Sequence, residues 1–218
     1  MRILVACEES QRVTIALRER GHEAYSCDIQ DCSGGHPEWH IMEDVLPLLN
    51  GYCTFKTTDG TEHEINTKWD MIIAFPPCTH LCCAGQRWFT EGKKPRSLQV
   101  EAIDFFMQFV KADCEKIAIE NPVGIMSTKY RKPNQIINPY QFGSTECKKT
   151  CLWLKGLPNL QPTDICPPEK RTTNIWKAIF NGKQYAWNDP ETAKWRSKTF
   201  PGIAKAMADQ WAGTVDNK

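Results

Sequence analysis

A cysteine that follows two prolines at the end of an apolar run is the residue in this sequence best suited to nucleophilic chemistry. The stretch DMIIAFPPCTHLCC runs from Asp70 to Cys83, and Cys78 comes directly after Pro76 and Pro77. Two prolines fix φ and remove two backbone donors, so the thiol is held on a stiff loop that cannot continue a strand ladder. If Cys78 ionises, its thiolate is a nucleophile; if it is simply buried, its thiol is inert. The stretch alone leaves both interpretations open.

A metal site is the alternative for the same stretch. Potential zinc ligands form two groups, which are Cys78, His80, Cys82 and Cys83, and then Cys147, Cys151 and Cys166. Structural zinc sites pair ligands as C-x(2–4)-C in turn-rich knuckles, and no Gly-rich knuckle surrounds these cysteines. We therefore expect no metal and assign His80, Cys82 and Cys83 to packing, with structural zinc as the minor alternative.

Acidic residues close other apolar runs. Glu120 and Asn121 end KIAIEN, where a carboxylate is costly to bury without a partner and so lies at a rim or is held for use. A polar cap before Pro122 is the alternative reading. Asp28 ends HEAYSCD, where an acid suits hydrogen bonds from a ribose, although aspartates there also form turns. Asp44 has the same ambiguity.

The elements that must position these residues begin as strand, helix, strand. RILVAC (2–7) predicts a strand, TIALRERG (14–21) a helix that ends at a glycine, and HEAYSCD (22–28) a second strand. DMIIAF (70–75) and KIAIENP (116–122) predict buried strands. This alternation predicts an α/β fold with a parallel sheet, whose ligands bind beyond the carboxyl ends of its strands. The residues expected to converge there are Cys7, Glu8, Asp28, Cys78, Glu120 and Asn121.

Other segments complete the expected fold. YCTFKTTDGTEHEINT (52–67) alternates around Asp-Gly, which predicts an antiparallel hairpin insertion. SLQVEAIDFFMQFVKA (97–112) predicts an amphipathic helix with Leu98, Ile103, Phe106 and Val110 as its inner stripe. KTCLWL (149–154) predicts a further strand and FPGIAKAMADQWAG (200–213) a closing helix.

Length and composition predict one globular domain. The 218 residues are 41% hydrophobic and 24% charged, which is near the average for globular proteins. No apolar run approaches the roughly 18 residues of a membrane span, and the N-terminus lacks signal-peptide features. We therefore expect a cytoplasmic protein without membrane contact. Eleven cysteines, an odd number, are expected to be mostly small buried residues in a reducing compartment.

Charge is unevenly distributed along the chain. Residues 1–66 hold five Lys/Arg against twelve Asp/Glu, whereas residues 143–200 hold ten against five. The stretch 156–197 is basic and Trp-rich and has no clear period. Basic residues interleaved with aromatic ones suit phosphate neutralisation and base stacking, and a satellite core is the alternative. The aromatic residues concerned lie within residues 143–200 and are Trp153, Trp176, Tyr185, Trp187 and Trp195.

Taken in order, these motifs resemble the DNA cytosine-5 methyltransferase family. FPPC resembles its Pro-Cys nucleophile motif, IEN its Glu-Asn motif, GSTECKKTCLWL its later basic strand and SKTFPGIAKAMADQWA its terminal helix. The resemblance implies a Rossmann-like, S-adenosylmethionine-dependent methyltransferase fold, with residues 1–218 as one catalytic domain. Residues 156–197 then stand in place of a large target-recognition domain, a compactness that resembles a small bacteriophage modification enzyme.

The resemblance implies methylation of C5 of cytosine in DNA, with S-adenosyl-L-methionine as cofactor. Cys78 would add to C6, Glu120 would hydrogen-bond at N3 and N4, and Lys148 would lie near O2. In duplex DNA the base would first be flipped out. The implied cofactor-binding positions are Ala6, Cys7, Glu8, Glu9, Asp28, Ile29, Asp44, Pro76 and Thr199. The implied substrate-binding positions are Pro77, Asn121, Arg87 and Thr150.

The sequence departs from the family pattern at several positions. CEES replaces the Gly-rich first loop, Thr79 stands where glutamine is usual, Pro122 replaces valine and Thr150 replaces an arginine. The absence of a large recognition domain leaves two alternatives open. One is the same chemistry on a free pyrimidine nucleotide such as dCMP, and the other is a catalytically silent relative that binds nucleic acid.

Overall fold

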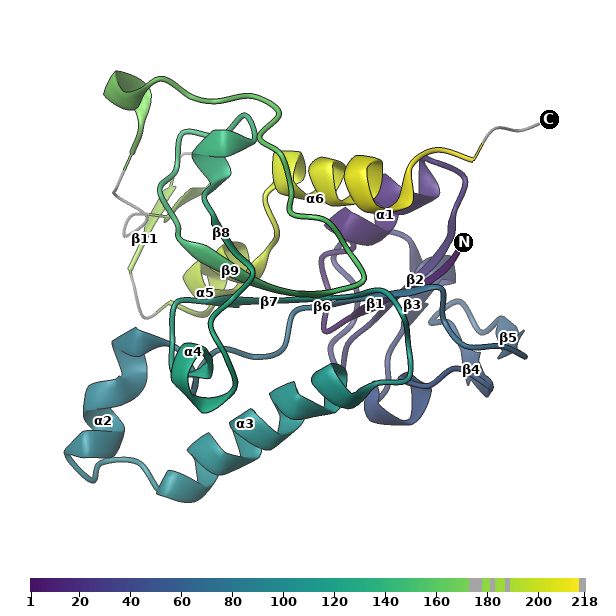
Figure 1. Cartoon of the computed structure of the whole chain (residues 1–218), viewed down its shortest axis with the longest axis horizontal. Helices are drawn as coiled ribbons and strands as arrows, with labels where there is room; N and C mark the ends of the chain where they lie inside the picture. Colours follow the sequence, from purple (N-terminus) through teal and green to yellow (C-terminus); the bar gives the residue numbers. More distant parts are fainter. Residues whose placement is uncertain (173–177, 181–182, 187–188, 216–218) are drawn as a thin grey trace.

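A seven-stranded sheet forms the centre of the computed structural model, which describes residues 1–172, 178–180, 183–186 and 189–215 (Figure 1). Its strand order is β3-β2-β1-β6-β7-β9-β8. The strands are β1 (Arg2–Ala6), β2 (Glu23–Cys27), β3 (His40–Ile41), β6 (Met71–Ala74), β7 (Ile117–Pro122), β8 (Gln135–Ile137) and β9 (Thr150–Lys155).

Strands β1, β2, β3, β6 and β7 are parallel, and β9 is antiparallel to both of its neighbours. The chain order reverses between β1 and β6, as in doubly wound sheets. The predicted Rossmann-like, mostly parallel α/β sheet is therefore confirmed. Because β9 runs the other way, its first residue Thr150 pairs with Pro122 at the carboxyl end of β7. Pro122 forms the last residue of β7, so the strand ends where the predicted segment KIAIENP ends.

Helices cover both faces of this sheet (Figure 1). The helices α1 (Arg12–Arg18) and α6 (Pro201–Met207) pack together on one face, and one π-helical turn (Ala208–Ala212) continues α6. The long helix α3 (Arg96–Lys111) covers the other face. The predicted central and closing helices are thus present, although α1 begins two residues earlier than expected and ends at Arg18 rather than at Gly21.

The core lies in two layers because side chains of a strand alternate between faces. In β1, Leu4 packs on the α3 side and Ile3 on the α1 and α6 side, and both are fully buried. In α3, Phe106 and Phe109 are fully buried, which is worth roughly 1.5–3 kcal/mol for each side chain. The other three residues of the predicted stripe are only half-buried, whereas Phe109, which was not predicted, is fully buried.

The predicted hairpin insertion is present as β4 (Cys53–Lys56) and β5 (Glu62–Ile65), which pair antiparallel. Asp59 closes the turn by accepting hydrogen bonds from Thr57 and Thr61. Phe55 and Ile65 are buried against the α3-side core, while alternate residues face outward. The alternating pattern therefore fixed both the strand type and its buried face.

Several short elements were not predicted, because too few residues form them to set a period. They are β3, β8, α2 (Gln86–Thr90) and α4 (Met126–Lys129), and within the basic stretch β10 (Ala178–Phe180), β11 (Lys183–Tyr185) and α5 (Pro190–Ser197). The 3-10 turns are Pro37–Trp39, Leu46–Leu48, Cys83–Gly85, Pro139–Gln141 and Pro168–Lys170. The turn at 46–48 falls within the predicted DVLPLL turn.

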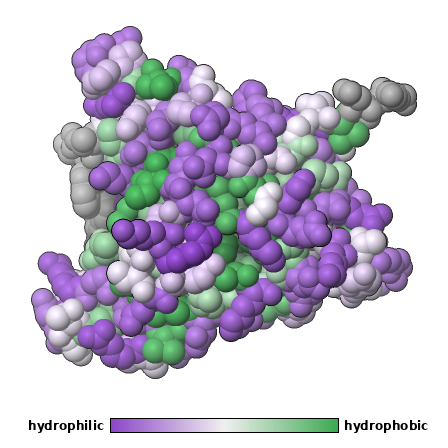
Figure 2. Space-filling view, viewed as in Figure 1, coloured by the Kyte–Doolittle hydropathy of each residue, from purple (hydrophilic) through white to green (hydrophobic). Residues whose placement is uncertain are grey.

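The predicted aromatic surface is only partly described by the structure. Trp153 lies in the core on β9 and is 2% exposed, so it cannot stack on a ligand. Trp195 lies half-buried on α5. Trp176, Trp187 and the side chain of Tyr185 lie outside the described residues. The face of the molecule in Figure 2 is mainly hydrophilic, and its apolar side chains form separate small patches.

All eleven cysteines lie in the described part of the chain, and all are free thiols. Cys27, Cys114 and Cys151 are buried, Cys83 is exposed, and the others are half-buried. The expectation that most of them are buried was therefore wrong. Within the described ranges, no helix has the length and apolar character that a membrane crossing requires.

Candidate active site

The carboxyl ends of four parallel strands meet at one edge of the sheet. Cys7 follows β1, Asp28 follows β2, Cys78 lies four residues after β6, and Glu120 lies near the end of β7. The antiparallel β9 begins at this same edge, so Lys148 arrives there from just before that strand. The structure thus brings residues from five separate segments to one edge of the sheet.

The loop that carries Cys78 is fixed to the neighbouring strand by Asn121. The Nδ2 atom of Asn121 donates to the carbonyl of Pro76 at 2.7 Å, and Asn121 is 1% exposed. Pro76 is buried, whereas Pro77 is exposed. Because an unsatisfied buried carbonyl costs about 1–3 kcal/mol, this bond keeps the Pro-Pro-Cys loop against β7. Asn121 therefore acts as a positioning residue for Cys78.

A tight turn after Cys78 is held by the segment that follows β7. The backbone N–H groups of Leu81 and Cys82 both donate to the carbonyl of Cys78 at 3.0 Å. Cys82 also forms an isolated β-bridge with Gly124. A Cβ at Gly124 would lie 2.1 Å from the carbonyl oxygen of Leu81, so this close approach requires glycine. These contacts fix the position of Cys82 relative to Cys78.

The Cys78 thiol donates a hydrogen bond to the sulfur of Cys82. This bond, burial and the nearby Glu120 carboxylate raise the pKa of Cys78 well above its ordinary value, and the positive charge of Lys148 opposes them. The pKa of Cys82 is lowered to about 6, because Cys78 donates to it and backbone N–H groups of the following turn, including that of Gly85, face its sulfur. The two sulfurs therefore titrate as a pair that shares a proton across this hydrogen bond, and Cys82 is the more readily ionised of the two.

Two cations act on this thiol pair. The Nζ atom of Lys148 donates to the carbonyl of Arg196 at 3.0 Å, and its charge favours the ionised forms of Cys78 and Glu120. Arg196 comes from α5 and interacts electrostatically with both thiols of the pair. Burial lowers the pKa of its guanidinium, and the thiols oppose this effect. We call the group of Cys78, Cys82 and Glu120 the thiol cluster. The basic stretch therefore supplies one of the positive charges that act on it.

Glu120 lies near the end of β7 and is half-buried. Burial raises the pKa of this carboxyl group, whereas the charge of Lys148 and a hydrogen bond from Thr150 lower it. Thr150 is itself buried, and its strand pairing with Pro122 brings it beside Glu120. A carboxyl group with a raised pKa keeps its proton to higher pH and can then donate a hydrogen bond.

A second group of acidic residues lies around the ends of β1 and β2. Burial raises the pKa of both Cys7 and Cys27, and the carboxylates of Asp28 and Asp44 add to the increase at both thiols. These two carboxylates therefore lie near each other across the two strand ends. Ile29 is 79% exposed at the same rim. Three of the positions expected to bind cofactor thus share one surface.

The loop between β1 and α1 uses Glu8 as an internal cap. The carboxylate of Glu8 accepts hydrogen bonds from the backbone N–H groups of Val13 and Thr14, at 2.7 and 3.2 Å, and from the hydroxyl of Thr14 at 2.8 Å. Burial raises the pKa of Glu8 to about 7, although these bonds oppose it. Glu8 thus faces the first turn of α1.

Glu9 and the backbone of the same loop are held in unusual states. Both carboxylate oxygens of Glu9 are buried and have no hydrogen-bond partner among the described residues, although the charge of Arg12 is within electrostatic range. Cys7 and Gln11 have φ angles of 59° and 55°, in the left-handed region that usually favours glycine. Cys7 and Gln11, at the two ends of this loop, therefore adopt glycine-like backbone angles without glycine, at about 1–2 kcal/mol for each residue.

The closing segment lies against this loop. The carbonyl of Thr199 accepts a hydrogen bond from Arg12 at 2.6 Å, and Lys198 donates to the hydroxyl of Ser33 at 2.9 Å. Ala6, the last residue of β1, is fully buried, and its carbonyl accepts a hydrogen bond from the loop after β6. By contrast, Arg87 is exposed on α2 and lies over the ring of Trp88 at 4.6 Å.

No three His, Cys, Asp or Glu side chains in the described ranges are arranged to hold a metal ion. The expectation that His80, Cys82 and Cys83 serve in packing was wrong for Cys82, which contacts Cys78, and for Cys83, which is exposed. His80 does pack against an aromatic ring, that of Phe89, with the ring centroids 5.8 Å apart.

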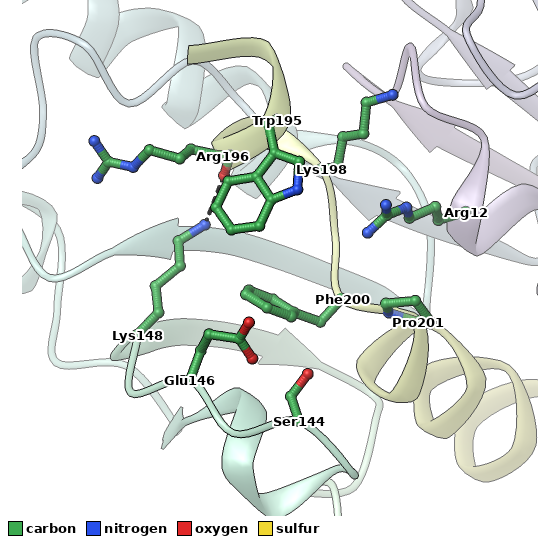
Figure 3. Close-up of a pocket in the computed structure, with 9 residues that line it drawn as sticks. All are labelled: Arg12, Ser144, Glu146, Lys148, Trp195, Arg196, Lys198, Phe200 and Pro201. Atoms are coloured by element: carbon green, nitrogen blue, oxygen red, sulfur yellow. Dashed lines mark hydrogen bonds between the residues drawn. The ribbon is translucent and has the colours of Figure 1, made fainter. Parts of the chain in front are cut away.

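A cavity of about 210 Å³ lies beside the thiol cluster, between the start of α1, residues 144–148 and the end of α5 (Figure 3). We call it the Trp195 pocket. The residues that define it here are Arg12, Glu146, Lys148, Trp195, Lys198 and Phe200. Arg196 also lines it, but its guanidinium extends away from Trp195 (Figure 3). Lys148 therefore lies between this pocket and the thiol cluster.

Sequence reasoning did not find Cys82, Arg12 or Arg196. One signal was available for Cys82, because residues four apart in a helical turn lie on the same side. Asp189 followed by Pro190 is a typical start of a helix, and it would have indicated α5 and so placed Arg196. Arg12 gave no comparable signal, because its contact with Thr199 joins distant parts of the chain.

Comparison with known proteins gives no match to any family model or curated protein. Among solved structures, the chain is similar to a proposed DNA modification methyltransferase encoded within an E. coli prophage, with a TM-score of 0.46, 15% identity and coverage of 77% of this chain and 52% of that one. It is also similar to the S. pombe Dnmt2 methyltransferase, with a TM-score of 0.43, 14% identity and coverage of 73% of this chain and 50% of that one. For the Entamoeba histolytica methyltransferase EhMeth the TM-score is 0.46 and the identity 10%, with coverage of 76% of this chain and 57% of that one. The chain thus spans about half the length of these structures, and at these values the similarity assigns no activity.

Proposed function

We propose that this chain is an S-adenosylmethionine-dependent methyltransferase that modifies C5 of cytosine in DNA. The observation that carries the proposal is the meeting of Cys78, Glu120 and Lys148, which come from three segments yet interact electrostatically at one edge of the sheet. A soft sulfur nucleophile, a carboxyl group with a raised pKa and a cation are the groups that addition to a pyrimidine ring requires.

The first step is addition of the Cys78 sulfur to C6 of cytosine. The sulfur electron pair forms the new S–C6 bond, the C5–C6 double bond opens, and negative charge moves onto the ring. The proton of the Cys78 thiol goes to Cys82, whose sulfur already accepts a hydrogen bond from it. Cys82 is then the general base of this step.

The charge that develops on the ring is stabilised by two side chains. A protonated Glu120 donates to N3, and its other oxygen accepts from the N4 amino group. The ammonium of Lys148 stabilises charge at O2. Burial acts on Glu120 in the required direction, because its raised pKa favours the protonated form. After methylation a base removes the C5 proton, the C5–C6 double bond re-forms and the Cys78 thiolate leaves.

The residues of the first strand ends fit the proposed methyl donor. Asp28 would accept hydrogen bonds from the ribose, and Asp44 and the exposed Ile29 would contact the adenine. The unpartnered, buried carboxylate of Glu9 would accept from the α-ammonium group, which no described residue supplies. When bound, this cofactor supplies an electrophilic methyl group on a sulfonium.

Covalent trapping tests this proposal directly. An oligonucleotide with 5-fluorocytosine cannot lose fluorine as a cation, so the Cys78–C6 adduct should persist after methyl transfer. We expect a complex stable to denaturation when protein, oligonucleotide and methyl donor are combined, and none with Cys78→Ala. Labelled dCMP assayed in parallel separates action on DNA from action on a free nucleotide. The absence of any adduct or transfer with either substrate contradicts the proposal.

A further inference from the structure

The Trp195 pocket has no role in the chemistry proposed above, yet it adjoins the same cluster. Lys148 lines the pocket, and its charge also reaches Cys78 and Glu120. Sites for drug-sized ligands measure about 300–1,000 Å³, so a cavity of about 210 Å³ accommodates one ring system rather than a whole nucleoside cofactor.

Two aromatic side chains border this cavity. Trp195 from α5 and Phe200 from the segment before α6 lie on facing sides of it (Figure 3), and both are half-buried. In the described part of the chain, neither ring packs against another aromatic ring. Every nucleobase has a flat face that stacks on such rings, so this arrangement suits a base.

Cations reach the cavity from opposite sides. The guanidinium of Arg12 points inward across from Lys148 (Figure 3). Both donate to backbone carbonyls, those of Thr199 and Arg196, and in the described ranges neither forms a salt bridge. Carboxylates act on them only at longer range, namely Glu8 and Glu9 on Arg12 and Glu120 on Lys148. Arg12 therefore keeps donors for a phosphate.

One carboxylate distinguishes this cavity from a simple anion site. The side chain of Glu146 projects into it below the two rings (Figure 3). A carboxylate repels phosphate but accepts hydrogen bonds from an exocyclic amino group, such as that of cytosine. A ligand that satisfies all these groups carries an amino-bearing base at one end and a phosphate at the other.

We propose that the Trp195 pocket holds the base of the nucleotide next to the one that reacts at Cys78, between Trp195 and Phe200, with the amino group of this base on Glu146 and the phosphate of the same nucleotide on Arg12 at the edge of the pocket. This inference rests on the proposed function and deepens it. It identifies the substrate as a polynucleotide strand, in which Lys148 lies between two adjacent bases, rather than as a free nucleotide.

Calorimetric titration of the full chain with trinucleotides, without any methyl donor, tests this inference. The ligands are dA-dC-dA, the two versions in which one flanking base is replaced by an abasic sugar, and dCMP. Only one of the two flanking bases occupies the pocket, so one of the two abasic ligands should bind about five-fold or more weakly than intact dA-dC-dA, as expected for the loss of one stacked base. Trp195→Leu should weaken binding of intact dA-dC-dA to the same extent. The same substitution should leave the affinity for that abasic ligand unchanged, because the base that stacks on Trp195 is already missing. Trp88→Leu, outside the pocket, should keep the difference between intact and abasic ligands.

Several results would overturn this inference. They are no binding of dA-dC-dA, equal binding of intact and abasic ligands, an equal loss of dCMP affinity in Trp195→Leu, or displacement of the trinucleotide by S-adenosylmethionine. The proposed function fails separately, because these titrations involve no methyl transfer. If intact and abasic trinucleotides bind differently but no cytosine is methylated, the base-binding pocket stands and the proposed methyltransferase function fails. If cytosine is methylated but intact and abasic trinucleotides bind equally, the function stands and the pocket proposal fails.

Discussion

The Cys78 thiol donates a hydrogen bond to Cys82, which lies four residues later in the same turn. Negative charge is therefore held more readily on Cys82 than on Cys78, although Cys78 is the residue that matches a nucleophile motif. The charge is stabilised there by the donated thiol proton and by backbone N–H groups. Cys78 becomes a thiolate when this proton moves to its neighbour.

This arrangement predicts which cysteine reacts first with an alkylating agent. Cys82 should react with iodoacetamide at pH 7 faster than Cys78, and its rate should fall as the pH is lowered through about 6. Peptide mapping by mass spectrometry measures both rates. In Cys82→Ser, Cys78 loses its hydrogen-bond acceptor, so its pKa should fall toward the ordinary value. Faster labelling of Cys78 than of Cys82 in the unsubstituted protein would contradict the assignment.

Removal of the Asn121 side chain should destabilise the protein and loosen the Cys78 loop. Asn121→Ala leaves the Pro76 carbonyl without its donor, which should lower the free energy of unfolding by about 1–3 kcal/mol. Urea denaturation measures this change. Asn159 is exposed, so Asn159→Ala should change the same quantity by no more than about 0.5 kcal/mol. Equal effects of the two substitutions would show that the Asn121 bond does not hold the loop.

Glu8 should make stability depend on pH. Its pKa is raised from 4.5 to about 7 in the folded protein, so the unfolded chain loses this proton first as the pH rises. The free energy of unfolding should therefore fall between about pH 4.5 and 7, by on the order of 3 kcal/mol, relative to Glu8→Gln. Thermal or urea unfolding of both proteins across this range gives the difference. A constant difference would mean that Glu8 ionises as readily in the folded protein as in the unfolded chain.

Lys148 should set the pH range in which Glu120 is protonated. Because its charge lowers the pKa of Glu120, Lys148→Met should raise that pKa. Methyl transfer, if it requires protonated Glu120, should then persist to higher pH while its maximal rate falls. The pH–rate profile measures both effects, and Lys148→Arg should restore the original profile. An unshifted profile in Lys148→Met would separate Lys148 from Glu120.

The sequence predicted those parts of the fold that repeat a period over enough residues. The alternation around Asp59 predicted the hairpin, and the apolar spacing from residue 97 to 112 predicted α3. The strands of two and three residues, β3 and β8, form only because neighbouring strands offer them partners, so no local pattern indicates them.

The candidate site was predicted where residues lie at strand ends, since parallel strands bring those ends together. Cys78, Asp28 and Glu120 were found in this way. Arg196 was not, because it reaches the thiols from a helix more than a hundred residues further along the chain. The capping role of Glu8 was also missed. It depends on left-handed backbone angles at Cys7 and Gln11, and residues other than glycine rarely adopt such angles.

The central claim is that this chain methylates cytosine in DNA through a covalent adduct of Cys78, and nucleoside mass spectrometry tests it most directly. DNA is incubated with the protein and S-adenosylmethionine that carries an isotopically labelled methyl group, then digested to nucleosides. We predict labelled 5-methylcytosine with the unsubstituted protein and none with Cys78→Ala. The absence of labelled 5-methylcytosine with the unsubstituted protein, or its undiminished formation with Cys78→Ala, would contradict the account.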